Sequence, residues 1–123
     1  MTKQAYPVNG AGLGLRREKM DEMLQAIADN GGKASGLSPV NFMEVAPENW
    51  INVGGTFGKK FRQFTERYDF VCHGLSLSIG GPSALDEDFV KDIAGFMQTH
   101  GIKHYSEHLT YCSDDGHLYD LLP

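Results

Sequence analysis

The sequence predicts an α/β fold, with about four parallel strands alternating with three helices. Short segments rich in β-branched and aromatic residues alternate with amphipathic stretches of helical period, and the connections between them are short. Strict alternation of this kind implies right-handed crossovers and therefore a parallel sheet. No internal repeat, low-complexity tract or linker divides the chain, so residues 1–123 are expected to form a single unit.

The first strand and helix are expected before residue 33. Residues 8–15 offer a turn and then a short glycine-rich strand. From Arg17 onward apolar residues recur at helical spacing, and Asn30-Gly31-Gly32 suits a left-handed helix end. The apolar face of this helix is formed by Met20, Met23, Leu24, Ile27 and Ala28.

A second strand is expected at residues 39–45, followed by a loop, 46–55, that is unusually rich in polar groups for a connector. An aromatic stripe at helical spacing then predicts the second helix. Such a stripe is more typical of a core face than of a platform for stacking bases. Its members are Phe57, Phe61, Phe64 and Tyr68.

The central strand begins at Phe70 and is followed by the Gly80-Gly81-Pro82 turn. Asp86 is a suitable N-cap for the third helix, and His100-Gly101 suits its end, where His100 is expected to interact with the helix dipole. The buried face of this helix is predicted to hold Val90, Ile93, Ala94 and Met97. A last strand is expected at residues 104–109.

Two features favour half of a TIM barrel over a small doubly wound sheet. Chemically capable side chains gather at the carboxyl ends of successive strands, where barrel enzymes place their sites, and the chain ends without a terminating element. A complete barrel needs about 250 residues. An open half leaves exposed strand edges, so we expect either a homodimer that closes two halves or a longer parent protein.

The composition excludes several functions. A net charge of −5 gives nucleic acid or an anionic membrane no electrostatic reason to bind. The first residues lack the apolar core of a signal peptide, and no apolar run has the length of a membrane span, so a cytoplasmic protein with free Cys72 and Cys112 thiols is expected. The glycines at 10, 12 and 14 match a dinucleotide loop only superficially.

Two histidines lie near the carboxyl ends of consecutive predicted strands. His73 follows Phe70-Val71-Cys72, and His108 lies in the last strand. Carboxyl ends of parallel strands meet at one edge of a sheet, so both imidazoles are candidates to bind one zinc, iron or copper ion. The alternative is that each is an ordinary core histidine. A Cys-His nucleophilic couple is not expected, because Cys72 faces away from His73 in a strand.

Two imidazoles do not complete a metal shell, so further polar groups are expected to line the site. Candidates are Glu44, Glu48, Asn49, Glu107 and His117. Glu48 has the alternative role of a helix cap or a solvated acid. In a regular strand Glu107 and His108 point to opposite faces; we expect His108 to face the barrel axis and Leu109 to pack outward against a helix.

The motifs at these positions resemble the multinuclear non-haem iron-dependent oxidase family, which includes the iron enzyme of methanobactin biosynthesis. The resemblance runs in order from about residue 10 to the last residue. It is carried by Gly12-Leu13-Gly14-Leu15-Arg16, Glu44-Val45-Ala46-Pro47-Glu48-Asn49-Trp50, His73-Gly74-Leu75-Ser76-Leu77-Ser78, Ser106-Glu107-His108-Leu109, and Gly116-His117 with Asp120-Leu121-Leu122-Pro123.

The resemblance implies a xylose-isomerase-like barrel whose iron cluster uses dioxygen to modify cysteines of a ribosomally made peptide. It also implies a separate protein that presents the peptide. His73 and His108 match the family's first two iron-binding histidines, and Glu44, Glu48 and Asn49 match a signature that lines the site. The remaining ligands of the family come from later strands.

Three functions therefore stay open. The first is the amino-terminal portion of an iron-dependent oxidase. The second is an inactive truncated half-barrel or interaction module, with no metal bound. The third is a zinc-type barrel hydrolase or isomerase that uses the same ligands at the strand ends.

Overall fold

The structure is a computed structural model that describes residues 8–111, 113–114 and 117–118. Along this part of the chain, strands and helices alternate as the sequence predicts. The helices are α1 (Met20–Asp29), α2 (Gly55–Thr65) and α3 (Glu87–His100), with short 3-10 turns η1 (Arg17–Lys19), η2 (Ala34–Leu37) and η3 (Pro47–Asn49). The strands are β1 (Ala11–Gly14), β2 (Val40–Val45), β3 (Asp69–Gly74), β4 (His104–Glu107), β5 (Ser113–Asp114) and β6 (His117–Leu118).

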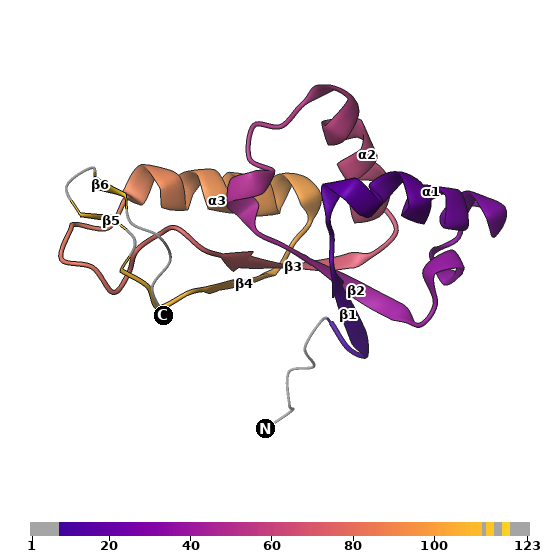
Figure 1. Cartoon of the computed structure of the whole chain (residues 1–123), viewed down its shortest axis with the longest axis horizontal. Coiled ribbons are helices and arrows are strands. Elements are labelled where there is room, and N and C mark those ends of the chain that lie inside the picture. Colours follow the sequence, from indigo (N-terminus) through magenta and orange to yellow (C-terminus); the bar gives the residue numbers. More distant parts are fainter. Residues whose placement is uncertain (1–7, 112, 115–116, 119–123) are drawn as a thin grey trace.

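The strands β1 to β4 form one parallel sheet in sequence order, β1-β2-β3-β4. Within the described residues, α1, α2 and α3 all lie on the same face of this sheet (Figure 1). Four parallel strands with helices on one side form an α/β fold with the arrangement of half a TIM barrel, so the predicted fold class is confirmed.

The core lies between the sheet and the helices and is centred on Phe61 of α2. The Phe61 ring is 2% exposed and stacks on Trp50 at 4.5 Å and on Phe96 at 5.7 Å, measured between ring centroids. Phe70 of β3 meets it edge-on at 5.6 Å. Aromatic pairs of this geometry add stability beyond the area that they bury, so this cluster joins α2, α3 and the sheet.

The opposite face of the sheet is open along the described residues. Strand β1 is exposed along its whole length, Glu44 of β2 is exposed, and Val71 of β3 is half-buried. Gly12 lies beside Phe42 on this face, and a methyl group at Gly12 would overlap the Phe42 ring. In a closed barrel this face would be the interior.

The predicted helix ends are confirmed. The Asp86 carboxylate accepts the Phe89 N–H at 3.0 Å and so caps the amino end of α3. Gly101 ends α3 with a positive φ of 69°, and Gly31 follows α1 with the same φ, a backbone conformation that glycine adopts without strain.

Several packing predictions are wrong. Phe57 is 40% exposed and Val90 is 37% exposed, because each lies at the edge of its helix stripe, and Phe96 fills the predicted place of exposed Ala94. Tyr68 is buried in the core as predicted, although it lies beyond the end of α2, and its hydroxyl donates to the Ala34 carbonyl at 2.5 Å.

The last strand is shorter than predicted. Strand β4 ends at Glu107, so His108 and Leu109 lie beyond it, and Leu109 is 75% exposed rather than packed on a helix. An antiparallel pair, β5 and β6, follows in a segment for which the sequence predicted no strand. Cys112 lies outside the described residues.

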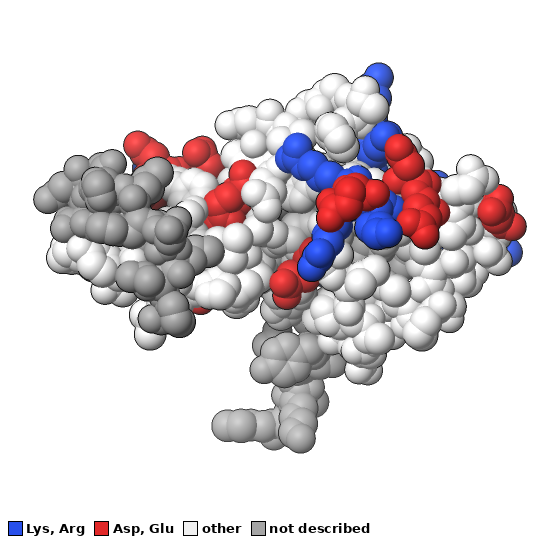
Figure 2. All heavy atoms as spheres, viewed as in Figure 1, with Lys and Arg blue, Asp and Glu red and all other residues white. Residues whose placement is uncertain are grey.

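The surface carries charges of both signs. Figure 2 shows acidic and basic side chains intermingled around α1 and α2 on the face viewed. Ion pairs of the described residues include Lys60 with Asp21 at 2.6 Å and Lys19 with Glu22 at 3.5 Å. Opposite charges therefore lie side by side on this part of the surface. Among the described helices, none combines the length and the apolar character that crossing a membrane requires.

Candidate metal centre at the carboxyl ends of the strands

The structure brings His73 and His108 together at the carboxyl edge of the sheet. Their ring centroids are 4.4 Å apart and the rings are tilted by 50°. A metal ion lies about 2.1 Å from a coordinating imidazole nitrogen, so two rings this close can share one ion. This spacing is the geometry that the strand-end hypothesis requires.

Ser106 holds the His73 ring in place. His73 of β3 pairs with Ser106 of β4, and the two side chains lie on one face, where the His73 Nδ1 is 2.7 Å from the Ser106 Oγ. When Nδ1 donates to this hydroxyl, Nε2 keeps the lone pair that a metal needs. Ser106 therefore acts as a positioning residue for the candidate ligand.

The backbone of His108 is fixed by two acceptors. Its N–H donates to the Gly74 carbonyl at 3.0 Å and to the Glu107 Oε2 at 3.1 Å. The other Glu107 oxygen accepts a short hydrogen bond from the Tyr105 hydroxyl. A methyl group at Gly74 would overlap the Glu107 carboxylate and approach the Tyr105 hydroxyl to 2.6 Å, so any larger residue there would displace this brace.

Glu48 links the loop after β2 to the loop after β3. Its Oε1 accepts the N–H of Leu75 at 2.9 Å and both the N–H and the hydroxyl of Ser76 at 3.2 Å. Its Oε2 is buried and has no hydrogen-bond partner among the described residues. The alternative that Glu48 caps a helix or is merely solvated is wrong, because it is half-buried and binds the segment that follows His73 and Gly74.

Cys72 and Tyr105 lie behind the histidines, on the face covered by the helices. Burial, with the Glu48 carboxylate as a second cause, raises the pKa of the Cys72 thiol to about 12. Burial and the hydrogen bond to Glu107 also raise the pKa of Tyr105. Cys72 therefore stays a neutral thiol at neutral pH, which agrees with the expectation that it is not a nucleophile.

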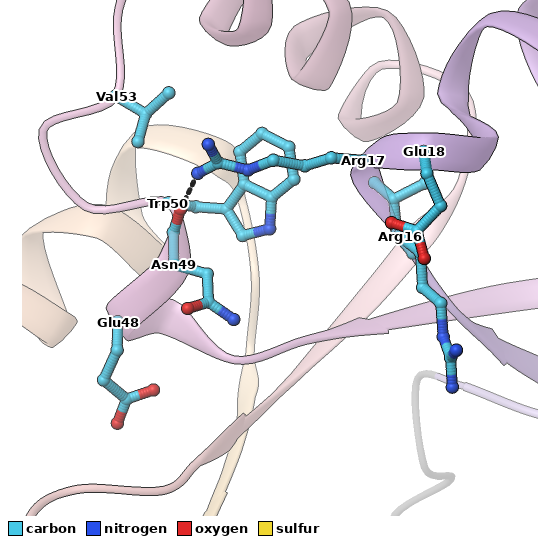
Figure 3. Close-up of a pocket in the computed structure, with 8 residues that line it drawn as sticks. Arg16, Arg17, Glu18, Glu48, Asn49, Trp50 and Val53 are labelled. Atoms are coloured by element: carbon cyan, nitrogen blue, oxygen red, sulfur yellow. Dashed lines mark hydrogen bonds between the residues drawn. The ribbon is translucent and has the colours of Figure 1, made fainter.

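A cleft of about 670 Å³ lies beside this edge, between the segments that follow β1 and β2. In Figure 3 the Arg17 side chain extends across one side of it above Trp50, and Arg16 faces Glu48 and Asn49 across the open space. The Arg17 guanidinium is 4.6 Å from the Trp50 ring centroid and donates a hydrogen bond to the Asn49 carbonyl. These contacts fix the η3 turn that carries Glu48 and Asn49.

The other predicted residues are distributed around the pair. Glu44 pairs with Val71 and so lies on the same sheet face as His73, but deeper along the strands. Asn49 is exposed in the cleft, and Glu107 braces His108 from behind. His117 falls in β6, and its side chain lies outside what the structure describes.

No third donor completes the shell within the described residues: no group of three or more His, Cys, Asp or Glu side chains there lies close enough to hold a metal ion. The described residues therefore fit part of a metal site, a pair of imidazoles. Four residues of the site were not predicted to line it: Ser106, Tyr105, Arg16 and Arg17. Ser106 and Arg16 stand in the motifs that carry the resemblance, whereas the place of Tyr105 follows only from the β3–β4 register.

The chain has an α/β fold consistent with half of a TIM barrel, and the strand-end histidines form a candidate site at the carboxyl edge of its sheet. Residues 10–123 match the family model described as RiPP precursor modification enzyme MbnB/TglH/ChrH, where RiPP denotes a ribosomally made, modified peptide. The chain belongs to this family, and the resemblance identified from its motifs is confirmed at the level of the family.

Curated relatives agree with this assignment. The chain is 57% identical over 121 residues to a UPF0276 protein of Alcanivorax borkumensis, and the alignment covers 98% of the chain and 39% of the relative. It is 58% identical over 112 residues to a UPF0276 protein of Shewanella sediminis (91% and 37%). It is 51% identical over 116 residues to UPF0276 protein PA3283 of Pseudomonas aeruginosa (94% and 38%). The chain thus spans about two-fifths of the length of these relatives.

Proposed function

We propose that this chain supplies His73 and His108 as two iron ligands of an enzyme that modifies cysteines of a ribosomally made peptide. The family description supports the peptide substrate. The single observation that carries the ligand assignment is the 4.4 Å separation of the two rings at the carboxyl edge of the sheet. Residues from the remainder of a full-length barrel would complete the shell.

Bound iron would supply the chemistry that side chains lack, the use of dioxygen to take up the electrons withdrawn from a substrate cysteine. The chain's own residues prepare the ligands. The Ser106 hydroxyl holds the His73 ring through Nδ1, and Gly74 and Glu107 fix the backbone of His108. Glu48 holds the loop that follows His73, so the His73 ring and the His108 backbone are positioned before any ion binds.

The ligand assignment is tested by anaerobic titration of the chain with ferrous iron, followed by calorimetry and metal analysis. His73→Ala and His108→Ala should each weaken iron binding by about tenfold or more, because each removes one of two imidazoles. His104→Ala is the matched control, since His104 lies at the opposite end of β4 and should leave binding unchanged. Equal binding by the chain and all three variants would refute the assignment.

The same pair of imidazoles suits zinc, so a zinc-dependent hydrolase or isomerase is the competing metal-dependent function. Competition between ferrous iron and zinc, followed by the aerobic oxidation of a cysteine peptide, separates the two. Peptide oxidation that requires iron and His73 supports the oxidase. Hydrolytic activity that is supported by zinc alone would replace it.

The open sheet face supports a second candidate, an interaction module that pairs with another half-barrel. Strand β1 is exposed along its length, and the relatives are about two and a half times as long as the chain. Uncovered parallel edges favour association, so a homodimer or a complex with a complementary half is expected. Light scattering of the purified chain tests this: a monomer that stays soluble at high concentration contradicts the homodimer.

A further inference from the structure

Neither histidine lines the cleft, but the cleft and the histidine loop have one residue in common, Glu48. Arg16 and Glu18 line it on the β1 side, and Glu48, Asn49 and Trp50 line it on the β2 side. Glu48 is shared with the candidate metal centre, because it also binds the backbone of Leu75 and Ser76, directly after Gly74. Glu48 therefore connects the cleft to the loop that follows His73 and Gly74.

The two arginines of the cleft have different roles. The Arg17 guanidinium is held between the Trp50 and Phe57 rings, at 4.6 and 5.2 Å from their centroids, and by the Asn49 carbonyl. Arg16 is exposed, and none of the carboxylates of the described residues lies within 4.0 Å of its guanidinium. Arg17 therefore forms part of the cleft wall through these contacts, whereas the charge of Arg16 is available to a ligand.

The chemistry of the opposing walls favours a carboxylate. A guanidinium presents a planar set of N–H donors that matches both oxygens of a carboxylate, and the Asn49 amide adds further donors across the cleft (Figure 3). Glu18 and Glu48 disfavour a doubly charged phosphate.

We propose that Arg16 and Asn49 form a subsite for a carboxylate of the peptide substrate, either an acidic side chain or the C-terminal carboxylate beside the target cysteine. The inference rests on the proposed function for the identity of the ligand as a peptide. It adds a rule of specificity: the substrate carries a negative charge next to the residue that is modified.

The test uses the fluorescence of Trp50, which is the only tryptophan of the chain and lies in the wall of the cleft. Three probes are titrated into the chain: acetyl-Gly-Cys-Asp-Gly-amide, its Asn analogue as the amide, and the same Asn analogue with a free C-terminal carboxylate. We expect at least one of the charged probes to bind about tenfold more tightly than the uncharged one, and the tighter charged probe identifies which carboxylate is recognised.

Substitutions localise the effect. Arg16→Gln should abolish the preference for the charged probe, Arg16→Lys should retain part of it because the charge remains without the planar fork, and Asn49→Ala should reduce it. Lys59→Gln removes an exposed positive charge on α2, outside the cleft, and should leave the preference intact. Equal affinity for all three probes, or a preference that survives Arg16→Gln, would overturn the subsite.

The outcome is separable from that of the proposed function. All titrations are run with and without ferrous iron, and the iron affinity of Arg16→Gln is measured in parallel. Retained iron binding together with no preference for charged probes refutes the subsite alone. A preference for charged probes in a chain whose iron binding does not depend on His73 would leave the subsite standing and refute the metal assignment.

Discussion

The two faces of the sheet differ in how far side chains of this chain cover them. On β3, Phe70 and Cys72 point toward the helices and are 5% and 1% exposed, whereas Val71 and His73 alternate with them and are only half-buried. The covered face is filled by residues of the chain itself. The open face carries the candidate ligands and lacks a third donor within the described residues.

This difference teaches where the stability and the chemistry of the molecule are located. The covered face holds the aromatic cluster around Phe61, which joins two helices to the sheet. The open face holds groups whose partners come from ions, peptides or other polypeptide segments. Substitutions on the covered face should therefore change the free energy of unfolding, and substitutions at the histidines should change binding.

The largest expected effect comes from truncating the centre of the covered face. Phe61→Ala removes a ring that contacts Trp50, Phe70 and Phe96 and should lower the free energy of unfolding by about 3–5 kcal/mol. Urea denaturation followed by circular dichroism measures the loss. Phe57→Ala is the matched control: its ring is 40% exposed, and the cost should be below about 1 kcal/mol. Equal costs would contradict the comparison.

The next effect lies at the boundary between the two faces. Gly74→Ala places a methyl group against Glu107 and Tyr105, so it should lower the free energy of unfolding by about 1–3 kcal/mol. Gly95→Ala is the control, because that position in α3 has open space and alanine favours a helix; a gain of up to about 1 kcal/mol is expected.

A double-mutant cycle assigns the Gly74 effect to the brace behind His108. In a Glu107→Ala background the carboxylate that the new methyl would strike is gone, so Gly74→Ala should cost less than in the original chain. An unchanged cost would mean that the strain comes from another contact, such as the Tyr105 hydroxyl, and not from the Glu107 carboxylate.

Most of the fold could be predicted because it depends on local patterns. Asp86 and Gly101 delimit α3 through caps that involve only neighbouring residues, and alternation fixed the parallel sheet. The exposure of side chains at the edges of the apolar helix stripes could not be predicted. Phe57 falls on the helical stripe, but its ring packs with Arg17 rather than entering the core. That contact joins residues 40 positions apart, beyond the reach of helical periodicity.

The candidate site was predicted only where position along a strand is sufficient. His73 and His108 follow from the rule that carboxyl ends meet, whereas Ser106 and Tyr105 depend on register. For His100 the position at the end of α3 was predicted correctly, but its contacts were not. The sequence suggested an interaction with the helix dipole, but its ring packs against Phe61 and Phe96 at 4.8 Å, and burial lowers its pKa, which disfavours the charged form.

The smallest expected effect depends on pH and probes the covered face through Cys72. Burial raises the pKa of this thiol from its usual 9.0 to about 12, so the folded state favours the neutral thiol. In the unfolded chain the thiol begins to ionise near pH 9. The stabilisation is therefore complete below pH 9 and is lost as pH rises toward 12, at up to about 1.4 kcal/mol per pH unit.

Urea denaturation at pH 8 and pH 10 isolates this contribution when the original chain is compared with Cys72→Ala. The variant will be less stable at both values because it leaves a small cavity, but the original chain should lose about 1.4 kcal/mol more than the variant between them. Groups that do not interact with Cys72 titrate alike in both proteins and cancel in the difference, whereas Tyr105, whose pKa Cys72 helps to raise, cancels only in part. Identical pH dependence would mean that the Cys72 thiol ionises as readily in the folded chain as in water, and the helices would then not seal that face of β3.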